Sequence, residues 1–231
     1  GGFNGNGATF GPETLWNYEL GTKAILLGGS LFFDGAIYYA DYKDRQAQSF
    51  VEITPGVFQA ITRNVGKATG PGVEAAVSAR LGAGLELTAT IGWNDIRNKT
   101  SNVEVLAGEP FDYVSKMTSS LALSQRFPLQ GDLKGMWRFD YQHADPYTGR
   151  VRIGQPGGTV ATLQDFRSAA QDYFNLRGGL EGKDWSLTLD VKNLFNKQPM
   201  LFPIPVLAQS QEGAHAVPRS VGLTLRKSFG S

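Results

Sequence analysis

The 231-residue sequence predicts an all-β fold of about nine antiparallel strands, and three observations support this prediction. Apolar and polar side chains alternate through many segments, which is the two-residue period of a β-strand. Short and long connectors alternate along the chain, as expected when consecutive strands run up and down within one layer. The charged residues of these segments fall on one face, opposite the apolar side chains.

The expected strands are each close to the ~10 residues that cross a bilayer as a tilted strand. In chain order they cover residues 14–26, 31–42, 72–81, 85–94, 117–127, 133–142, 173–181, 185–192 and 221–229. The last of them is among the clearest, because Val221, Leu223 and Leu225 share one face. Such a face turns either towards a protein core or towards lipid, and this choice decides the class of protein.

The connectors differ systematically in length. The short ones are residues 28–30, 82–84, 130–132 and 182–184, and they are rich in Gly and Asp, which favour tight turns. The long ones are residues 43–71, 95–116, 143–171 and 194–217. This pattern is typical of outer-membrane barrels, which have short periplasmic turns and long extracellular loops.

The charged face and the aromatic residues indicate that the apolar face of the strands is turned towards lipid and not towards a protein core. Charges of both signs are interspersed on the polar face, which suits a wet lumen and not a second packed core; Lys227 is the visible exception to the pattern. Aromatic residues gather at both strand ends: Trp16, Trp93 and Tyr141 on the long-loop side, and Phe127, Trp185 and Phe229 on the short-turn side. Two aromatic belts flank the apolar band of membrane barrels. The sequence therefore predicts an antiparallel transmembrane β-barrel segment.

Composition narrows the range of functions. A net charge of +1 argues against nucleic acid as the main partner. The absence of Cys excludes disulfides, Cys-based zinc sites and thiol nucleophiles. No run approaches the ~18 apolar residues of a transmembrane helix. Residues 1–7 have neither an initiator Met nor the features of a signal peptide, so we expect the chain to be part of a longer protein.

Four motifs occur in a fixed order on this strand pattern. They are PETLWNYELGTK at residues 12–23 with AIYYADYKDRQ at 36–46, NVGKA at 64–68 leading to GVE at 72–74, VKNLFNK at 191–197, and PRSVGLTL at 218–225. Together they resemble the C-terminal barrel region of TonB-dependent outer-membrane receptors, from residue 12 to residue 229.

The resemblance implies a larger protein. Members of the family carry a signal, a TonB box and a plug domain before a barrel of about 22 strands. Residues 1–231 would then be the C-terminal portion of the barrel, without the plug domain and the N-terminal strands. Bacterial single-chain barrels have an even number of strands, which also makes about nine an incomplete set.

The resemblance also implies a function. It points to TonB-dependent uptake of a scarce nutrient, such as a ferric siderophore, in the bacterial outer membrane, with no enzymatic activity and no cofactor. The expected partners are outer-membrane lipid, the small nutrient ligand, the TonB complex through the plug domain, and the barrel-assembly machinery. Phe229 would be the C-terminal aromatic signal that this machinery reads. A passive porin-like or structural barrel is the main alternative, and a soluble β-sandwich binding module is a third.

The sequence gives little support for a metal site, a catalytic residue or a phosphate-binding loop. His143 and His215 have no metal-ligand spacing, and we expect both to be loop residues in solvent, with no metal site. Ser124 and Ser168 are not linked to a His by any sequence feature, so no catalytic residue is predicted. Residues 66–72 lack the order of a phosphate-binding loop.

The remaining candidates are turn residues and loop residues. Asn193 and Asn196 follow a strand, where Asn commonly forms turns by bonding to nearby backbone. The loop residues 145–152 carry an aromatic and two cations, and other long loops add Phe111, Tyr113, Phe166 and Phe202. Such a surface suits an anionic iron chelate or a glycan, but the ligand-binding residues stay unknown.

Overall fold

The computed structural model describes residues 2–3, 9–54, 57–101, 105–154, 160–203 and 213–229. Strands dominate this part of the chain, and its helical element is the short 3₁₀ turn η1 (Leu27–Gly29). None of the described residues form a helix with the length and apolar character needed to span a membrane. The predicted all-β, antiparallel class is confirmed.

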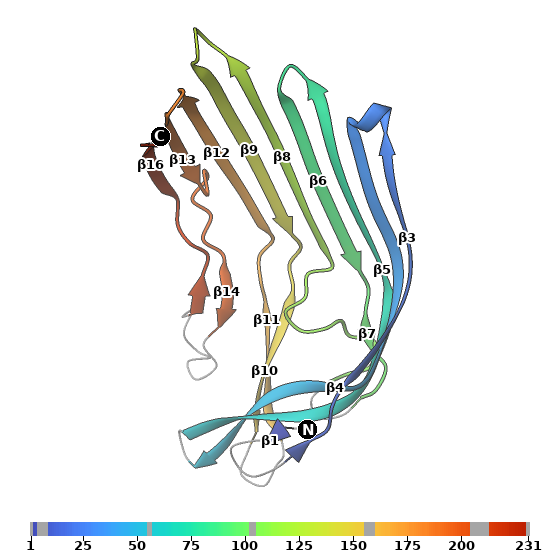
Figure 1. Cartoon of the computed structure of the whole chain (residues 1–231). Helices are drawn as coiled ribbons and strands as arrows, with labels where there is room; N and C mark the ends of the chain where they lie inside the picture. The colour runs from blue at the N-terminus through green and yellow to red at the C-terminus, as the bar shows by residue number, and fades with distance from the viewer. Residues whose placement is uncertain are drawn as a thin grey trace.

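One large curved sheet makes up most of the structure (Figure 1). Nine of its strands follow one another as antiparallel neighbours: β3 (Thr14–Leu26), β4 (Leu31–Thr54), β5 (Val57–Gly82), β6 (Leu85–Asn94), β8 (Met117–Pro128), β9 (Lys134–Ala144), β12 (Gln171–Glu181), β13 (Trp185–Lys192) and β16 (Ser220–Lys227). Each of the nine segments expected from the alternation contributes to one of these strands. The size of the complete barrel stays a prediction.

Shorter strands extend the sheet at one end. β7 (Arg97–Asn98) pairs with β5, and β10 (Thr148–Gly154) pairs in antiparallel fashion with β11 (Val160–Arg167). β10 also runs parallel to the far part of β4. Two pairs of short strands form separate two-stranded sheets: β1 (Gly2–Phe3) with β2 (Thr9–Phe10), and β14 (Met200–Pro203) with β15 (Gly213–His215).

The prediction that residues 43–71 form a long connector is wrong. β4 and β5 continue through most of this range as one long hairpin, which in Figure 1 bends across the end of the sheet opposite the short turns. The register shifts between Tyr42 and Arg45 and again between Arg45 and Gln46. These bulges interrupt the two-residue period, so the alternation that marks a strand is lost here. β10 and β11 likewise occupy part of the expected connector 143–171.

The short connectors all lie at one end of the sheet, the upper end in Figure 1. They join β3 to β4, β5 to β6, β8 to β9 and β12 to β13. The turn before β6 requires glycine at residue 84, whose φ is +73° and whose added Cβ would lie 1.9 Å from the carbonyl oxygen of Arg126. The lopsided arrangement predicted from the sequence is therefore present, with residues 43–71 as its exception.

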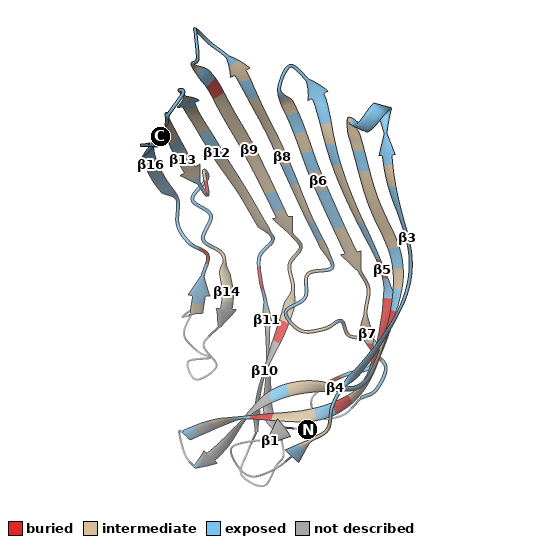
Figure 2. Ribbon diagram, in the orientation of Figure 1, coloured by how far each residue is buried: buried red, intermediate tan, exposed pale blue. Residues whose placement is uncertain are grey.

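The sheet has almost no protein core. Within the described ranges, the buried apolar residues are Ala40, Ile61, Val65, Ala68, Val105 and Ala216. By contrast, Leu20 and Leu223 are 72% and 71% exposed, and intermediate and exposed residues cover most of the strands in Figure 2. A β-sandwich would cover such side chains with a facing sheet, and the described residues form none. The soluble sandwich alternative is therefore not supported.

Candidate functional site

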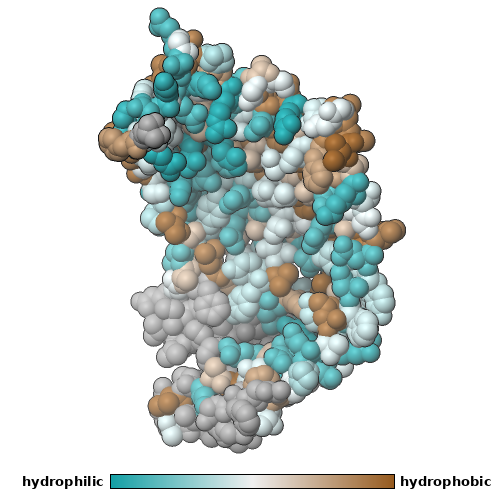
Figure 3. Space-filling view, in the orientation of Figure 1, coloured by the Kyte–Doolittle hydropathy of each residue, from teal (hydrophilic) through white to brown (hydrophobic). Residues whose placement is uncertain are grey.

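The strand register separates an apolar face from a polar face across the whole sheet. On the apolar face, Leu121 of β8 lies between Ala89 of β6 and Tyr141 of β9. The next residue, Ala122, lies on the other face between Thr88 and Asp140. Figure 3 shows hydrophilic side chains over much of the viewed face, with a larger hydrophobic group at its upper right edge. The two-sided pattern expected from the sequence is present.

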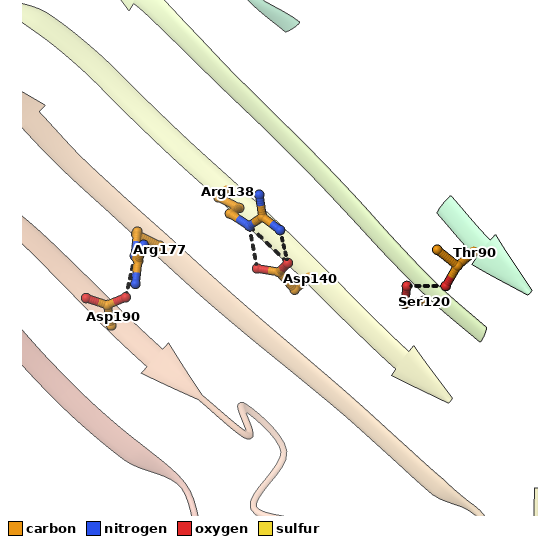
Figure 4. Close-up of polar contacts among 6 residues, drawn as sticks. All are labelled: Thr90, Ser120, Arg138, Asp140, Arg177 and Asp190. Atoms are coloured by element: carbon orange, nitrogen blue, oxygen red, sulfur yellow. Dashed lines mark hydrogen bonds and ion pairs between the residues drawn. The ribbon is translucent and has the colours of Figure 1, made fainter. Parts of the chain in front are cut away.

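Two arginines at the centre of the polar face each have a carboxylate partner (Figure 4). Arg138 of β9 contacts Asp140 through Nε, 3.0 Å from both carboxylate oxygens, and through a terminal nitrogen at 2.6 Å. Arg177 of β12 pairs with Asp190 of β13. Because Arg138 and Arg177 lie directly opposite each other in the register, these carboxylates offset their mutual repulsion. Both guanidinium groups remain about half exposed, so water screens the pairs.

Further pairs of polar side chains lie on the same face in other strands of the sheet. Lys23 of β3 lies 3.2 Å from Asp34 of β4. The hydroxyl oxygens of Thr90 and Ser120 are 2.7 Å apart across β6 and β8 (Figure 4). Such a wall of solvated, mutually satisfied groups suits a water-filled lumen, while the exposed apolar face suits lipid.

Hydrogen bonds hold the connectors together at the opposite end from the short turns. The backbone N–H of Tyr113 donates to the carbonyl oxygen of Thr148 at 2.8 Å. Ser168 and Tyr147 exchange two bonds, from the Ser168 N–H to the Tyr147 carbonyl at 3.0 Å and from the Tyr147 N–H to the Ser168 hydroxyl at 2.9 Å. The Tyr147 hydroxyl donates to the carbonyl oxygen of Leu201. Burial raises the pKa of Tyr147, so this donor keeps its proton at neutral pH.

Part of the predicted aromatic loop surface comes together here. The ring of Tyr147 lies 6.0 Å from that of Tyr113 and 6.5 Å from that of Phe166. The ring of Phe111 packs against other side chains, edge-on to Tyr42 at 5.1 Å and under the guanidinium group of Arg45 at 4.2 Å. The side chains of Phe202, Arg150 and Arg152 lie outside the described residues.

Of the two histidines, His215 is exposed, as expected, whereas His143 is not. His143 belongs to the end of β9, with Nδ1 2.9 Å from Asp172 and Nε2 3.2 Å from Asp145, so the prediction of a solvated loop histidine is wrong for it. His215 lies in β15, with Nδ1 3.1 Å from the carbonyl oxygen of Gln198. In the part of the chain that the structure describes, no group of three or more His, Asp or Glu is placed to hold a metal ion.

The serines have structural positions. The Ser168 hydroxyl accepts the bond from Tyr147, and Ser124 lies in β8 opposite Glu86 and Arg138 on the polar face. Among the described residues, no hydrogen bond joins either serine to a histidine. Residues 66–72, which the sequence excluded as a phosphate loop, lie within β5.

The turn role predicted for the two asparagines is confirmed. Both have positive φ, +49° at Asn193 and +52° at Asn196. The Asn193 side chain accepts from the Lys197 N–H at 2.9 Å and donates to the carbonyl oxygens of Lys197 and Val217 at 2.7 and 2.9 Å. Asn196 accepts from the Arg219 N–H at 2.9 Å. The pair therefore ties the turn after β13 to the chain entering β16.

The end of β16 is fastened to the turn between β12 and β13. The Ser228 N–H donates to the carbonyl oxygen of Asp184 at 2.8 Å, and the Lys227 ammonium pairs with the Asp184 carboxylate. The hydrogen bond from Lys227 lowers the pKa of Asp184. This partner explains why Lys227 departs from the apolar pattern. Phe229, just beyond, is 89% exposed at the short-turn end.

The structure is a single sheet with one exposed apolar face and one solvated, ion-paired face. Short turns lie at one end of the sheet and long connectors at the other. These features define the wall of a transmembrane β-barrel. The particular family follows from comparison with known proteins. Residues 1–194 match the family described as TonB dependent receptor-like, beta-barrel, and the chain belongs to this family. The barrels of this family are bacterial outer-membrane proteins, so the predicted family and location are both confirmed.

Solved structures show the same fold. The ferripyoverdine receptor of the Pseudomonas aeruginosa outer membrane has a TM-score of 0.69 and 18% identity over 98% of this chain and 29% of its own length. The ferric yersiniabactin uptake receptor of Yersinia pestis has a TM-score of 0.69 and 20% identity, covering 94% and 30%. The ferric-catecholate import receptor of K12 E. coli has a TM-score of 0.67 and 18% identity, covering 99% and 30%.

The chain therefore spans less than a third of the length of these solved receptors. Their low sequence identity limits the likeness to the fold. A copper transporter has a similar fold as well, with a TM-score of 0.65 and 16% identity, covering 94% of this chain and 31% of its own. No curated protein sequence matches the chain.

Proposed function

We propose that this chain is part of a receptor for TonB-dependent uptake of a scarce nutrient, such as a ferric siderophore, across the outer membrane. The observation that carries this proposal is the family match over residues 1–194. The solved relatives described above are receptors or transporters, which supports a role without enzymatic chemistry. The copper transporter among them leaves the cargo open beyond iron chelates.

Residues 1–231 form, in this proposal, the C-terminal portion of a larger barrel. Among the described strands, β3 pairs with β4 alone and β16 with β13 alone, so each of these two strands leaves one edge unpaired. Unpaired backbone groups in lipid cost several kcal/mol each, and membrane barrels avoid them by closing. Further strands from the same protein would close these edges, and a plug domain would occupy the wet lumen.

The proposed partners follow from this arrangement. Lipid of the outer membrane contacts the apolar face, and a small nutrient ligand enters from the end with the long connectors. The TonB complex acts through the plug domain, outside residues 1–231. The barrel-assembly machinery reads Phe229, whose exposed ring at the end of β16 leaves it accessible for recognition.

Uptake measurements test the transport proposal. A strain that lacks the protein should lose growth on one ferric siderophore supplied as the sole iron source. Loss of TonB in an otherwise intact strain should cause the same defect, because energy reaches the receptor only through TonB. Uptake that persists without TonB would instead identify a passive, porin-like barrel and would refute the proposal.

Replacement of the terminal aromatic tests the assembly role separately. Phe229→Asp should lower the amount of folded protein in the outer membrane, whereas Phe229→Tyr should preserve it because an aromatic ring remains. Heat-modifiable migration on a gel measures the folded fraction. Equal levels of Phe229→Asp and Phe229→Tyr would remove the assembly signal from the proposal without affecting the transport part.

A further inference from the structure

A small pocket of about 140 Å³ lies where several connectors meet, at the end of the sheet opposite the short turns. Its walls come from residues 94–97 after β6, residues 110–116 before β8, residues 146–148 after β9, and Arg167 at the end of β11. These segments are far apart in the sequence, and no motif connects them.

Backbone hydrogen bonds hold the walls in place without any ligand. The Asn94 N–H donates to the carbonyl oxygen of Lys116 at 2.9 Å, and the bonds of Tyr113 with Thr148 and of Ser168 with Tyr147 join the other segments. A site that is already ordered does not lose this conformational entropy when a ligand binds. The pocket is thus preorganised.

The charges that line the pocket are unequal. Three basic side chains, Arg97, Lys116 and Arg167, face a single carboxylate, that of Asp95. The lining therefore carries two positive charges in excess. An excess of like charge in a confined site favours a ligand of the opposite sign.

The single carboxylate is already engaged by two of the cations. Asp95 accepts from Arg97 at 3.0 and 2.8 Å and lies 3.4 Å from the Lys116 ammonium. The hydrogen bond from Arg97 lowers the pKa of Asp95, so it stays ionised. Arg97 also donates to the carbonyl oxygen of Gly108 at 2.7 Å, which fixes its guanidinium group as part of the wall.

Lys116 and Arg167 still have hydrogen-bond donors to spare. The Lys116 ammonium has three protons to donate, and Asp95 is its one anionic partner among the described residues. No carboxylate of the described ranges forms an ion pair with Arg167, which is exposed. Phe111 and Pro146 supply apolar wall, which lowers the local dielectric and strengthens charge interactions.

We propose that this pocket binds an oxyanion of the phosphate or carboxylate type. Arg167 and Lys116 contact the anion, while Arg97 acts as a positioning residue through Asp95. Pockets that enclose a drug-sized molecule occupy roughly 300–1,000 Å³, so this one takes a single anionic group and not a whole chelate. The anion comes either from a lipid headgroup or from a soluble molecule. The inference does not depend on the proposed uptake function.

Titration of the detergent-solubilised protein with inorganic phosphate tests the pocket. Calorimetry at low ionic strength should show binding, weakened about tenfold or more by Lys116→Gln or by Arg167→Gln, since each removes a charge-assisted hydrogen bond. Arg167→Lys should retain most of the affinity. The matched control is Lys134→Gln, which removes an exposed cation from the short-turn end and should leave binding unchanged.

A vesicle arm distinguishes the source of the anion. The protein is tested for binding to soluble fragments of lipid A and to phosphatidylcholine vesicles with or without lipid A. Binding that needs lipid A and is lost in Arg167→Gln assigns the pocket to a headgroup phosphate; binding of free phosphate alone assigns it to a soluble anion. Both results support the pocket.

The proposal is overturned if phosphate and lipid A bind equally well to the Lys116→Gln, Arg167→Gln and wild-type proteins, or bind to none of them. Misfolding of a variant does not account for a loss of binding, because binding is measured only on the isolated folded fraction, identified by its heat-modifiable migration. Arg167→Gln is the safer variant, since it removes an exposed side chain with no ion-pair partner among the described residues.

Discussion

Leu121 and Ala122 are adjacent in β8 but face opposite sides of the sheet, so they offer a direct test of which side meets lipid. β8 lies inside the sheet, paired with β6 on one side and with β9 on the other. An arginine near the bilayer midplane of a barrel costs ~2–4 kcal/mol, which is roughly a 30- to 900-fold loss in the folding equilibrium. We expect a loss of this size from Leu121→Arg. Ala122→Arg places its cation opposite Asp140, and we expect a change below about 1 kcal/mol.

Denaturant titration of both variants, folded into phosphatidylcholine vesicles, measures these free energies of unfolding. Leu121→Ala serves as the control for lost packing, because Leu121 is already 36% exposed in the protein alone. Its loss should be much smaller than that of Leu121→Arg. Equal destabilisation by the two arginine variants, or a larger effect of Ala122→Arg, would refute the assignment of the apolar face to lipid.

Three further changes test local features. Gly84→Ala should lower stability by more than Gly131→Ala in parallel denaturant titrations: both glycines have positive φ, but only at residue 84 would the new Cβ collide with backbone, and equal losses would contradict this. Asn193→Ala should cost about 1–3 kcal/mol, because it leaves half-buried turn groups without partners; an unchanged unfolding midpoint would count against its turn role. The pKa of Asp184 is lowered in the folded state. The ionised Asp184 carboxylate therefore stabilises the folded state above its ordinary pKa of 3.8, and this stabilisation is lost as the pH falls below that value. The stability difference between wild type and Asp184→Asn should therefore shrink on acidification, and a difference that grows would exclude the pair with Lys227.

The strands were predictable because their signal is local. A strand with one face in lipid and the other in water must alternate residue by residue, so each segment carries its own evidence of burial. Residues 185–192, expected as a strand, form β13 with the same bounds. The motifs at residues 12–23 and 191–197 added the family, which alternation alone does not distinguish from other barrels.

The long hairpin of β4 and β5 was not predictable in the same way. Beyond the membrane neither face meets lipid, so no selection for an apolar face maintains the alternation. The bulges around Arg45 shift the period further. Residues 43–71 consequently resembled a long connector, although their backbone is paired nearly throughout.

The polar pairs and the connector pocket depend on register, which alternation alone leaves open. The period-two pattern places Arg177 and Asp190 on the same face but does not make them neighbours. The short turn after β12 does so: once it sets Glu181 opposite Ser186, residues 176–181 of β12 each have a fixed partner in β13, and Arg177 must lie opposite Asp190. The same turn presents Asp184 to Lys227, the residue that broke the sequence pattern. A one-residue slip of β13 against β12 would turn its apolar side chains to the lumen, so lipid itself enforces the register that forms these pairs.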